Sequence, residues 1–183
     1  YYNSVSGKQL LQSVSFSLYR GRILGVAGVE GNGQKELSEI LTGLRSFTRG
    51  EITLEGESVK GKSVRQIRQM GISNISEDRM TYGCAPTMSV TDNIIADRYY
   101  SGKYSHGIRL DVKAIRHDVE ELVKTFDVVC PGTASMSGML SGGNIQKMIA
   151  AREFTSGARV IVANQPTRGI DVGSSEFIHQ QLV

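Results

Sequence analysis

The feature of this sequence that most constrains its fold is a glycine-rich stretch between an apolar run and an amphipathic run. "RILGVAG" (22–28) predicts a buried strand, and "QKELSEILTGL" (34–44) has leucine and isoleucine at helical spacing. Between the two runs, Gly28 and Gly33 have the glycine spacing of the phosphate-binding pattern G-x-x-x-x-G-K-[ST]. A strand, a glycine loop and a helix in this order predict an α/β domain.

The residues after the second glycine depart from that pattern. Gln34 stands where the lysine is expected, and Lys35 stands where the serine or threonine is expected. Lys35 cannot replace the lysine, because the next residue along a helix is turned by about 100°. Glycines at 28, 31 and 33 permit positive φ, so their N–H groups can still face a phosphate. Taken alone, the stretch is equally consistent with a glycine turn that begins a helix and binds nothing.

The rest of the chain continues the alternation of strands and helices. Alternating apolar and polar residues over 13–21 and 50–59 predict a small antiparallel layer beside the parallel core. Further strands are expected in "GISNIS" (71–76) and "ARVIVAN" (158–164), and helices over 89–100 and 111–126, the second with Asp111 as its N-cap.

Composition excludes several classes of protein. The chain of 183 residues has no apolar run long enough to span a membrane and no secretory h-region. Its net charge of +3 is small and its basic residues are scattered, so we expect no nucleic-acid partner. Its two cysteines have no partner at metal-ligand spacing and are expected to be reduced thiols. Because the sequence lacks an initial methionine and stops within a predicted helix, we expect a C-terminally truncated piece.

A second glycine turn opens another predicted helix in "LSGGNIQK" (140–147). The Ser141 hydroxyl and the amides of Gly142 and Gly143 can hold a terminal phosphate at the helix N-terminus. The alternative is a serine N-cap followed by a flexible glycine pair. The stretch resembles the L-S-G-G-Q signature of ABC-type ATPases, in the L-S-G-G-N form found in sugar and nucleoside importers.

A third stretch, "VIVANQPTRGIDVG" (160–173), is similar to the Walker B strand and D-loop of the same family. Asn164 stands at the position of the metal-supporting aspartate, and Gln165 at the position of the glutamate that polarises water. An amide has the shape of a carboxylate, but it neither accepts a proton nor offers negative charge to Mg²⁺. A buried strand that ends in a proline turn explains the apolar part only. The family's remaining residues are present as Pro166, Thr167, Gly169 and Asp171.

The segment "ISNISEDRMTYG" (72–83) resembles the Q-loop region in the second ATPase half of ribose, galactose and nucleoside importers. The resemblance places Glu77 at the position that senses the γ-phosphate. Asp78 and Arg79 are equally consistent with a surface ion pair of little energetic value. Tyr82 and the tyrosines of "DRYY" (97–100) belong either to an interface or, as we expect, to a helix core.

The resemblance covers nearly the whole chain and implies a P-loop NTPase-like fold of the ABC ATPase type. That fold has a mostly parallel sheet, a small antiparallel β layer and an inserted helical subdomain. It implies three parts: an ATP-binding core over 1–77, the helical subdomain over 78–139, and the signature helix, Walker B strand and D-loop over 140–183. The likeness is greatest to the degenerate C-terminal ATPase half of a tandem importer ATPase for simple sugars or nucleosides. Such a domain lies in the cytoplasm, peripheral to the inner face of the plasma membrane, and binds transmembrane permease subunits.

The pairing of domains in this family gives the departures a meaning. The signature of one domain contacts ATP held by the other, so this chain would act in trans on the first ATPase domain of the same polypeptide or on a dimer mate. Its own site would hold ATP or ADP weakly, hydrolyse little and leave Mg²⁺ to the partner site, so no metal ligand is assigned. The residues implied in trans are Ser141, Gly142, Gly143 and Asn144, with Asp171 in the D-loop. Those implied at its own site are Gly28, Glu30, Gly31, Asn32, Gly33, Gln34, Lys35 and Glu36, with Glu77, Asn164 and Gln165 at the catalytic positions.

Some alternatives stay open at this point. One is a regulatory or structural domain that binds no nucleotide, and another is a self-sufficient P-loop kinase or GTPase, against which the missing lysine and acids argue. The resemblance implies an aromatic residue that stacks on adenine, for which Tyr1 and Tyr2 are candidates. It places the switch histidine beyond Val183.

Overall fold

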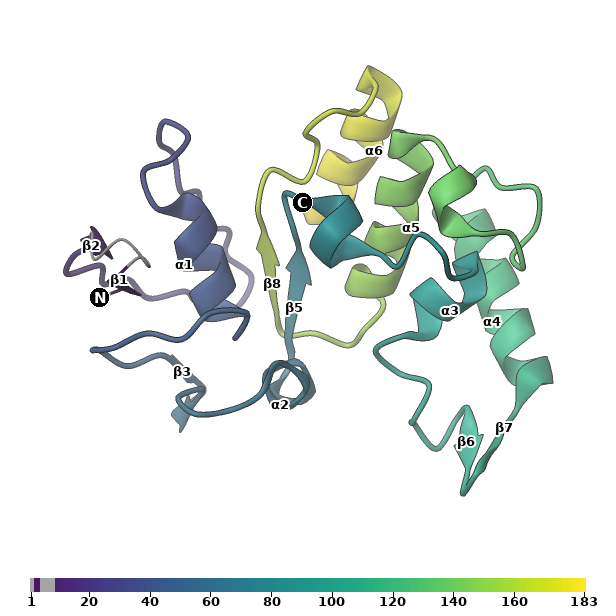
Figure 1. Ribbon diagram of the computed structural model, residues 1–183, viewed down its shortest axis with the longest axis horizontal. Helices are drawn as coiled ribbons and strands as arrows, with labels where there is room; N and C mark the ends of the chain where they lie inside the picture. Colours follow the sequence, from purple (N-terminus) through teal and green to yellow (C-terminus); the bar gives the residue numbers. More distant parts are fainter. Residues whose placement is uncertain (1, 4–8) are drawn as a thin grey trace. The chain divides into compact units, whose positions relative to one another are not determined.

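The chain folds as two units, Tyr1–Ile72 and Ser73–Val183. The computed structural model describes residues 2–3 and 9–183 (Figure 1). Unit 1 contains two antiparallel strand pairs and two helices. Its elements are β1 (Tyr2–Asn3), β2 (Gln9–Leu11), α1 (Gln34–Leu41), β3 (Thr53–Leu54), β4 (Glu57–Ser58) and α2 (Val64–Met70).

The strands predicted over 22–28 and 13–21 are not formed. No strand is assigned between residues 12 and 52 of the described chain, and the side chains of Ile23 and Val26 are 73% and 57% exposed. A strand requires a hydrogen-bonded neighbour for its backbone groups, and among the described residues of unit 1 no strand pairs with these runs. These sequence predictions were therefore wrong for this structure, although the apolar pattern was typical of a strand.

Two other predictions for unit 1 are confirmed: antiparallel strands within 50–59 and a helix that begins near Gln34. β3 and β4 form an antiparallel hairpin within 50–59, joined by Glu55 and Gly56, both at positive φ as a tight primed turn requires. α2 begins at a capping box in which the Ser63 hydroxyl accepts from the Gln66 N–H while the Gln66 side chain accepts from the Ser63 N–H. α1 begins at Gly33, close to the start expected from its periodicity.

In unit 2, β5 (Ile72–Ile75) pairs with β8 (Val160–Ala163); three helices lie in the connection between the two strands, and one helix follows β8. The two strands point the same way in Figure 1, as a crossover connection requires. The remaining elements are the π-helical turn η1 (Arg79–Gly83), α3 (Val90–Ile95), β6 (Ser105–His106), β7 (Arg109–Leu110), α4 (Val112–Thr125), the 3₁₀ turn η2 (Ser137–Met139), α5 (Gly142–Phe154) and α6 (Val172–Leu182).

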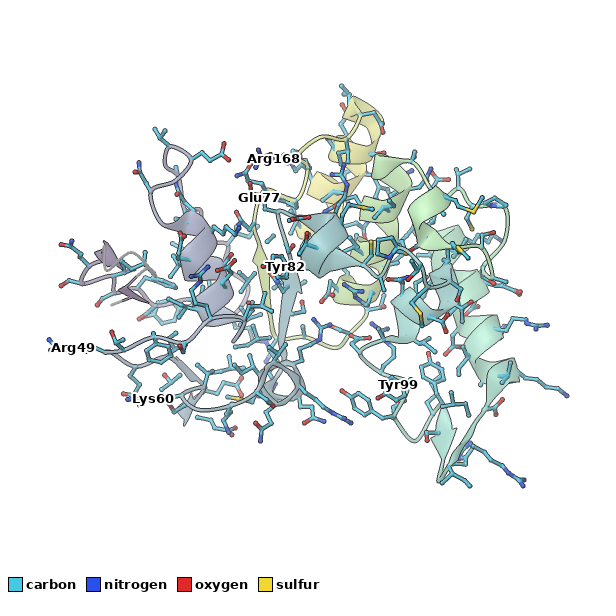
Figure 2. All side chains as sticks on the ribbon, in the orientation of Figure 1. Arg49, Lys60, Glu77, Tyr82, Tyr99 and Arg168 are labelled. Atoms are coloured by element: carbon cyan, nitrogen blue, oxygen red, sulfur yellow. The ribbon has the colours of Figure 1, made fainter. Side chains whose placement is uncertain are left out.

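Each strand and helix predicted for unit 2 has a counterpart in the structure, and the short hairpin of β6 and β7 was not predicted. Asp111 caps α4 through the N–H groups of Lys113 and Ala114, as the sequence predicts. The helix expected over 89–100 ends earlier, at Ile95, and continues as a turn. The tyrosines that we expected in a helix core are not there: the side chains of Tyr82 and Tyr99 are 52% and 44% exposed (Figure 2).

The core of unit 2 surrounds α5, which contacts α3, α4, α6 and η1. Ala150 and Ala151 are fully buried, and Met148 and Ile149 are almost so, because the helix is enclosed by these neighbours on several sides. Gly83 of η1 lies against this helix, since a Cβ there would be 2.8 Å from Ile149 Cδ1. The position of α5 therefore determines the positions of its neighbours.

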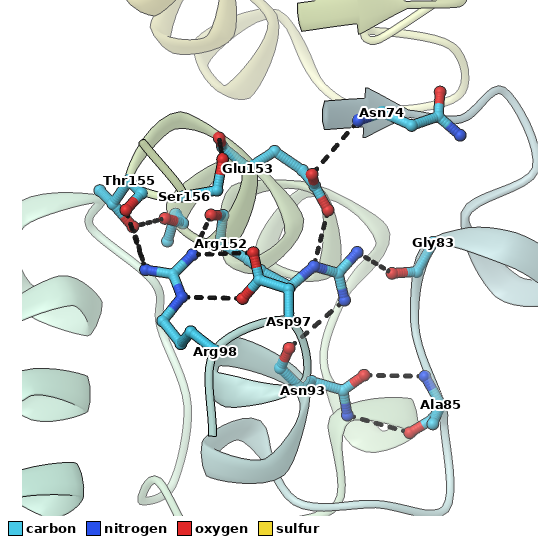
Figure 3. Close-up of polar contacts among 11 residues, drawn as sticks. Asn74, Gly83, Ala85, Asn93, Asp97, Arg98, Arg152, Glu153, Thr155 and Ser156 are labelled. Carbon is cyan, nitrogen blue, oxygen red and sulfur yellow. Dashed lines mark hydrogen bonds and ion pairs between the residues drawn. The ribbon is translucent and has the colours of Figure 1, made fainter. Parts of the chain in front are cut away.

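The C-terminal turn of α5 carries a buried polar network (Figure 3). The Glu153 side chain is fully buried and accepts hydrogen bonds from the Asn74 N–H, at 3.3 Å, and from Arg152 Nε, at 2.7 Å. The Arg152 guanidinium also donates to the Gly83 carbonyl at 2.6 Å and the Asn93 carbonyl at 3.3 Å. These bonds connect α5 to β5, η1 and α3, and they satisfy a carboxylate that would be costly to bury alone.

None of the helices in the described residues combines the length and the hydropathy that crossing a bilayer requires.

We predict that Glu153→Ala lowers the free energy of unfolding by about 3 kcal/mol, because it leaves the Arg152 guanidinium buried without its carboxylate partner. Urea unfolding followed by circular dichroism measures the change. Glu120→Ala, on the exposed face of α4, is the matched control and is expected to change stability by less than about 0.5 kcal/mol. Equal effects of the two substitutions would contradict the role of the network.

Candidate functional site

The glycine loop of unit 1 uses its glycines in two ways. Gly31 and Gly33 have φ of 88° and 104°, in the left-handed region that glycine adopts without strain, as predicted. Gly28 is not at positive φ, contrary to the expectation for it. A Cβ at Gly28 would lie 2.2 Å from Gln34 Nε2, so a larger residue there would displace the end of the Gln34 side chain.

The Gln34 side chain folds back over the loop. Its Nε2 donates to the Val29 carbonyl at 3.1 Å, and it lies against Gly28. Gln34 therefore lies across the loop as an uncharged carboxamide, where the phosphate-binding pattern has a lysine. Lys35 is exposed and Gln34 is half-buried, which agrees with the expectation that Lys35 points to a different side of the helix.

The other candidate residues of this loop surround the N-terminus of α1. Glu30, Gly31 and Asn32 are exposed, and the Asn32 N–H donates to the Val29 carbonyl at 3.3 Å. Glu36 is half-buried in the first turn of α1. No side chain caps α1, so the first N–H groups of the helix are available to an anion.

The second glycine turn, in unit 2, orients a serine hydroxyl. Ser141 is the N-cap of α5, and its Oγ accepts from the Asn144 N–H at 3.4 Å and from Asn144 Nδ2 at 2.9 Å. Asn144 is itself held, because its Oδ1 accepts from the Val129 N–H at 2.8 Å. With two donors directed at its oxygen, the exposed Ser141 hydroxyl has its own proton free to donate to an acceptor outside the chain.

Gly143 brings the signature turn against the start of α6. A Cβ at Gly143 would lie 2.5 Å from Ser174 Oγ and 2.7 Å from Asp171 Oδ2, so any larger residue would displace this contact. Asp171 caps α6 by accepting from the Ser174 N–H at 2.9 Å and the Ser174 hydroxyl at 2.8 Å. Those two bonds lower the pKa of the Asp171 carboxyl. The structure thus brings together two groups of predicted residues, the signature and the D-loop.

The residues predicted at the catalytic positions also meet, at the end of β8. The Asn164 N–H donates to the Ile75 carbonyl at 2.9 Å, and Asn164 Nδ2 lies 3.5 Å from Glu77 Oε2. Glu77 forms an ion pair with Arg168 (Figure 2). Gln165 is exposed and has a φ of 46°, which turns the chain away from the strand.

This group of side chains does not fit Mg²⁺. Magnesium prefers carboxylate oxygens, and positions 164 and 165 supply neutral amides. The carboxylate of Glu77 is neutralised by the Arg168 guanidinium. We therefore assign no step at this chain's own site to a metal ion.

Sequence reasoning missed the role of Arg79, and it did not consider Arg168. Asp78 caps η1 through the N–H groups of Met80 and Thr81, and Arg79 donates to the carbonyls of Arg168 and Gly169. Arg79 and Arg168 are 89 residues apart, so no local pattern relates them. An arginine beside the Q-loop position was the only available signal.

A group of possible metal ligands lies elsewhere, on α4, although the sequence assigned no metal site. His117, Asp118 and Glu121 have ligand atoms within 4.8 Å of one another. The Asp118 carboxylate already has two partners within the chain, because it accepts from the Tyr104 hydroxyl at 2.6 Å and forms an ion pair with Lys103. Burial and this hydrogen bond raise the pKa of Tyr104 to about 12.

The two candidates for the aromatic residue that stacks on adenine are not placed: Tyr1 and the side chain of Tyr2 lie outside the described residues.

Solved structures show the class of fold. The chain superimposes on the dimeric structure of MJ0796, a bacterial ABC transporter cassette, with a TM-score of 0.77 and 19% identity, over 94% of this chain and 73% of that one. A structure of MJ0796 bound to ADP and Pi gives a TM-score of 0.75. The fold is therefore the P-loop NTPase-like α/β fold of the ABC ATPases, as predicted.

Sequence comparison shows the family. Residues 11–168 match the family model described as ABC transporter, and the chain belongs to that family. It is 41% identical over 179 residues to the glucose import ATP-binding protein TsgD13 of Haloferax volcanii, covering 97% of this chain and 32% of the relative. The guanosine import ATP-binding protein NupO of Bacillus subtilis is 38% identical over 97% of this chain and 35% of its own length. The ribose import ATP-binding protein RbsA of Clostridium perfringens is 35% identical over 98% and 36%. The chain thus spans about a third of the length of the curated relatives it matches.

We predict that the Asp171 cap stabilises α6 only while its carboxyl is ionised. The folded pKa is lowered below the usual 3.8, so this stabilisation is present above the unfolded pKa and is lost as pH falls through the folded value. Asp171→Asn keeps an N-cap without the charge. We expect the melting temperatures of wild type and Asp171→Asn to differ at pH 7 and to converge at about pH 2.

Glu176→Gln removes an equal charge from the exposed side of the same helix and is the control. A difference between wild type and Asp171→Asn that stays constant over this range would contradict the prediction.

Proposed function

We propose that this chain is a nucleotide-binding domain of an ABC importer for simple sugars or nucleosides. In this proposal, ATP binding and hydrolysis at the interface of two paired domains energise transport. The observation that carries the proposal is the exposed Ser141 hydroxyl, whose oxygen accepts from Asn144, so that its proton is free for an acceptor outside the chain. The names of the relatives, which are import ATP-binding proteins for glucose, guanosine and ribose, support the substrate class.

The signature of this chain would act in trans. A serine hydroxyl and the first N–H groups of α5 form a donor set for the terminal phosphate of an ATP held by another domain. That domain is the first ATPase domain of the same polypeptide or a dimer mate. Mg²⁺ would accompany the nucleotide there, on ligands that the partner supplies.

The chain's own site is proposed to bind ATP or ADP weakly and to hydrolyse it little. In unit 1, Gln34 covers the loop without positive charge, so the β- and γ-phosphates lose the cation that the pattern normally supplies. In unit 2, Asn164 and Gln165 cannot act as bases toward water. Both departures weaken the same reaction, so the chain would act as an ATPase only within the complex.

Transmembrane permease subunits are the proposed partners, and the location is the cytoplasmic face of the plasma membrane. Met80 and Tyr82 of η1 are 44% and 52% exposed, and Met88 is 48% exposed. Exposed methionine and tyrosine side chains are adaptable apolar contacts, typical of a surface that binds another protein. The boundaries 1–77, 78–139 and 140–183 remain part of this proposal.

A regulatory or structural domain without nucleotide is the second candidate, and Gln34 favours it, because its side chain already occupies the loop.

Nucleotide binding separates the two candidates. We predict that the chain binds a fluorescent ATP analogue weakly, without measurable turnover, and that Gln34→Lys strengthens binding about tenfold by adding a cation at the phosphates. Lys60→Ala, at an exposed position of unit 1 outside the loop, is the control and should leave binding unchanged. Absence of binding at millimolar analogue in both wild type and Gln34→Lys would favour the structural candidate.

The trans role is tested in the assembled transporter. We predict that Ser141→Ala lowers ATP hydrolysis at least about tenfold, since removal of one preorganised donor from a reacting centre has effects of this size or larger. Ser63→Ala is the matched control, because it removes the N-cap of α2, outside the proposed contacts. Unchanged hydrolysis and transport in Ser141→Ala would contradict the trans role.

A further inference from the structure

We propose that Arg79 is a positioning residue which, together with the ion pair between Glu77 and Arg168, holds the signature turn and the D-loop in one arrangement. We call Glu77, Arg79, Arg168 and Gly169 the latch. The inference rests on the proposed function in one respect: the reaction that the latch serves is the trans contact of the signature. The latch itself is a feature of unit 2 alone and can be tested apart from that reaction.

The Arg79 guanidinium lies between two segments. Its Nη1 donates to the Arg168 carbonyl at 2.7 Å, and its Nη2 donates to the Gly169 carbonyl at 3.1 Å. A Cβ at Gly142 would lie 2.8 Å from Nη2 and 3.5 Å from the Gly169 carbonyl oxygen. One side chain therefore contacts the start of α5 and the turn before α6 at the same time.

A second contact runs in the opposite direction between the same segments. The Arg168 side chain reaches back to Glu77, two residues before Arg79, and forms an ion pair with it. Glu77 also lies 3.5 Å from the Asn164 side chain at the end of β8. Because each segment supplies an arginine to the other, the two are connected at two points, and a rotation about either contact is opposed by the other.

The chemistry of arginine suits this place. A planar guanidinium with several fixed N–H groups can donate to two neighbouring carbonyls at once, whereas a lysine ammonium is a compact charge without that fork. Gly169 has a φ of 64°, and this left-handed backbone allows the turn to bend around the guanidinium. The two carbonyls accept charge-assisted hydrogen bonds, which are stronger than neutral ones.

The latch lies next to the two groups that act in the proposed function, the D-loop and the signature. Two residues after Gly169, Asp171 caps α6 and lies against Gly143 of the signature. A displacement of the turn at 168–169 would therefore move the carboxylate of Asp171 and, through it, the N-terminus of α5. Arg79 touches neither nucleotide nor water in this proposal, and it acts through the segments that it holds.

Hydrogen exchange of the protein measures the latch directly. We expect Arg79→Ala to accelerate hydrogen exchange about tenfold at the amides of Arg168 and Ser174. An effect of this size corresponds to the loss of one to two charge-assisted hydrogen bonds. Exchange within α4 should be unchanged. Arg79→Lys should recover part of the protection, and Arg116→Ala, on the exposed face of α4, should have no effect. Unchanged exchange at 168–174 in Arg79→Ala would overturn the latch.

Charge reversal at the two residues tests the ion pair. Glu77→Arg and Arg168→Glu each place like charges together and should accelerate hydrogen exchange at the Arg168 amide. The double variant restores opposite charges and should return exchange toward the wild-type rate. Additive effects of the two substitutions would show that the pair does not act as a unit and would overturn this part of the proposal.

Hydrolysis in the assembled transporter tests the positioning role. We expect Arg79→Ala to lower kcat about tenfold with the KM for ATP unchanged, and Arg79→Lys to recover part of the rate. If exchange accelerates but hydrolysis is unchanged while Ser141→Ala still lowers it, the positioning role is overturned. If Ser141→Ala is also without effect, the trans function fails and the exchange data still support the latch.

Discussion

The buried carboxylate of Glu153 is the interaction on which the rest of unit 2 depends. Its pairing with Arg152 and the Asn74 N–H connects α5 to β5, and Arg152 extends the same network to η1 and α3. A charge with no exposure has no solvent to compensate a lost partner, so these segments must keep their places together. The opposite end of α5 carries Ser141 and the glycine pair, and this network therefore determines where the signature lies.

The departures from the family pattern differ in their physical character. Gln34 is accommodated by its surroundings: it folds onto the Val29 carbonyl, and Gly28 leaves room for it. At position 164 the amide lies beside Glu77, whose charge Arg168 neutralises. The signature, by contrast, keeps an exposed hydroxyl whose oxygen accepts from two donors of Asn144. This contrast favours a domain that lends its donors to a neighbour over one that hydrolyses nucleotide alone.

Local patterns were sufficient wherever the deciding interaction lies within a few residues. Asp111 and Ser141 each cap the helix that follows, because an N-cap requires only its own side chain and the next turn of backbone. The run 22–28 shows the opposite case. Its apolar residues are typical of a buried strand, but a strand also needs a neighbour, and sequence periodicity carries no information on pairing. Arg79 was missed for a related reason, since its acceptors lie 89 and 90 residues further along the chain.

The sequence by itself determined the family, the α/β order, the helix caps and the substitutions at Gln34, Asn164 and Gln165. Tertiary structure alone decided what those residues touch. It placed Gln34 across its own loop, Asp171 against Gly143, and Arg79 between the signature turn and the turn at Gly169. Caps and periodicity are properties of a few consecutive residues, whereas the contacts of Asp171 and Arg79 exist only after segments distant in sequence have packed around α5.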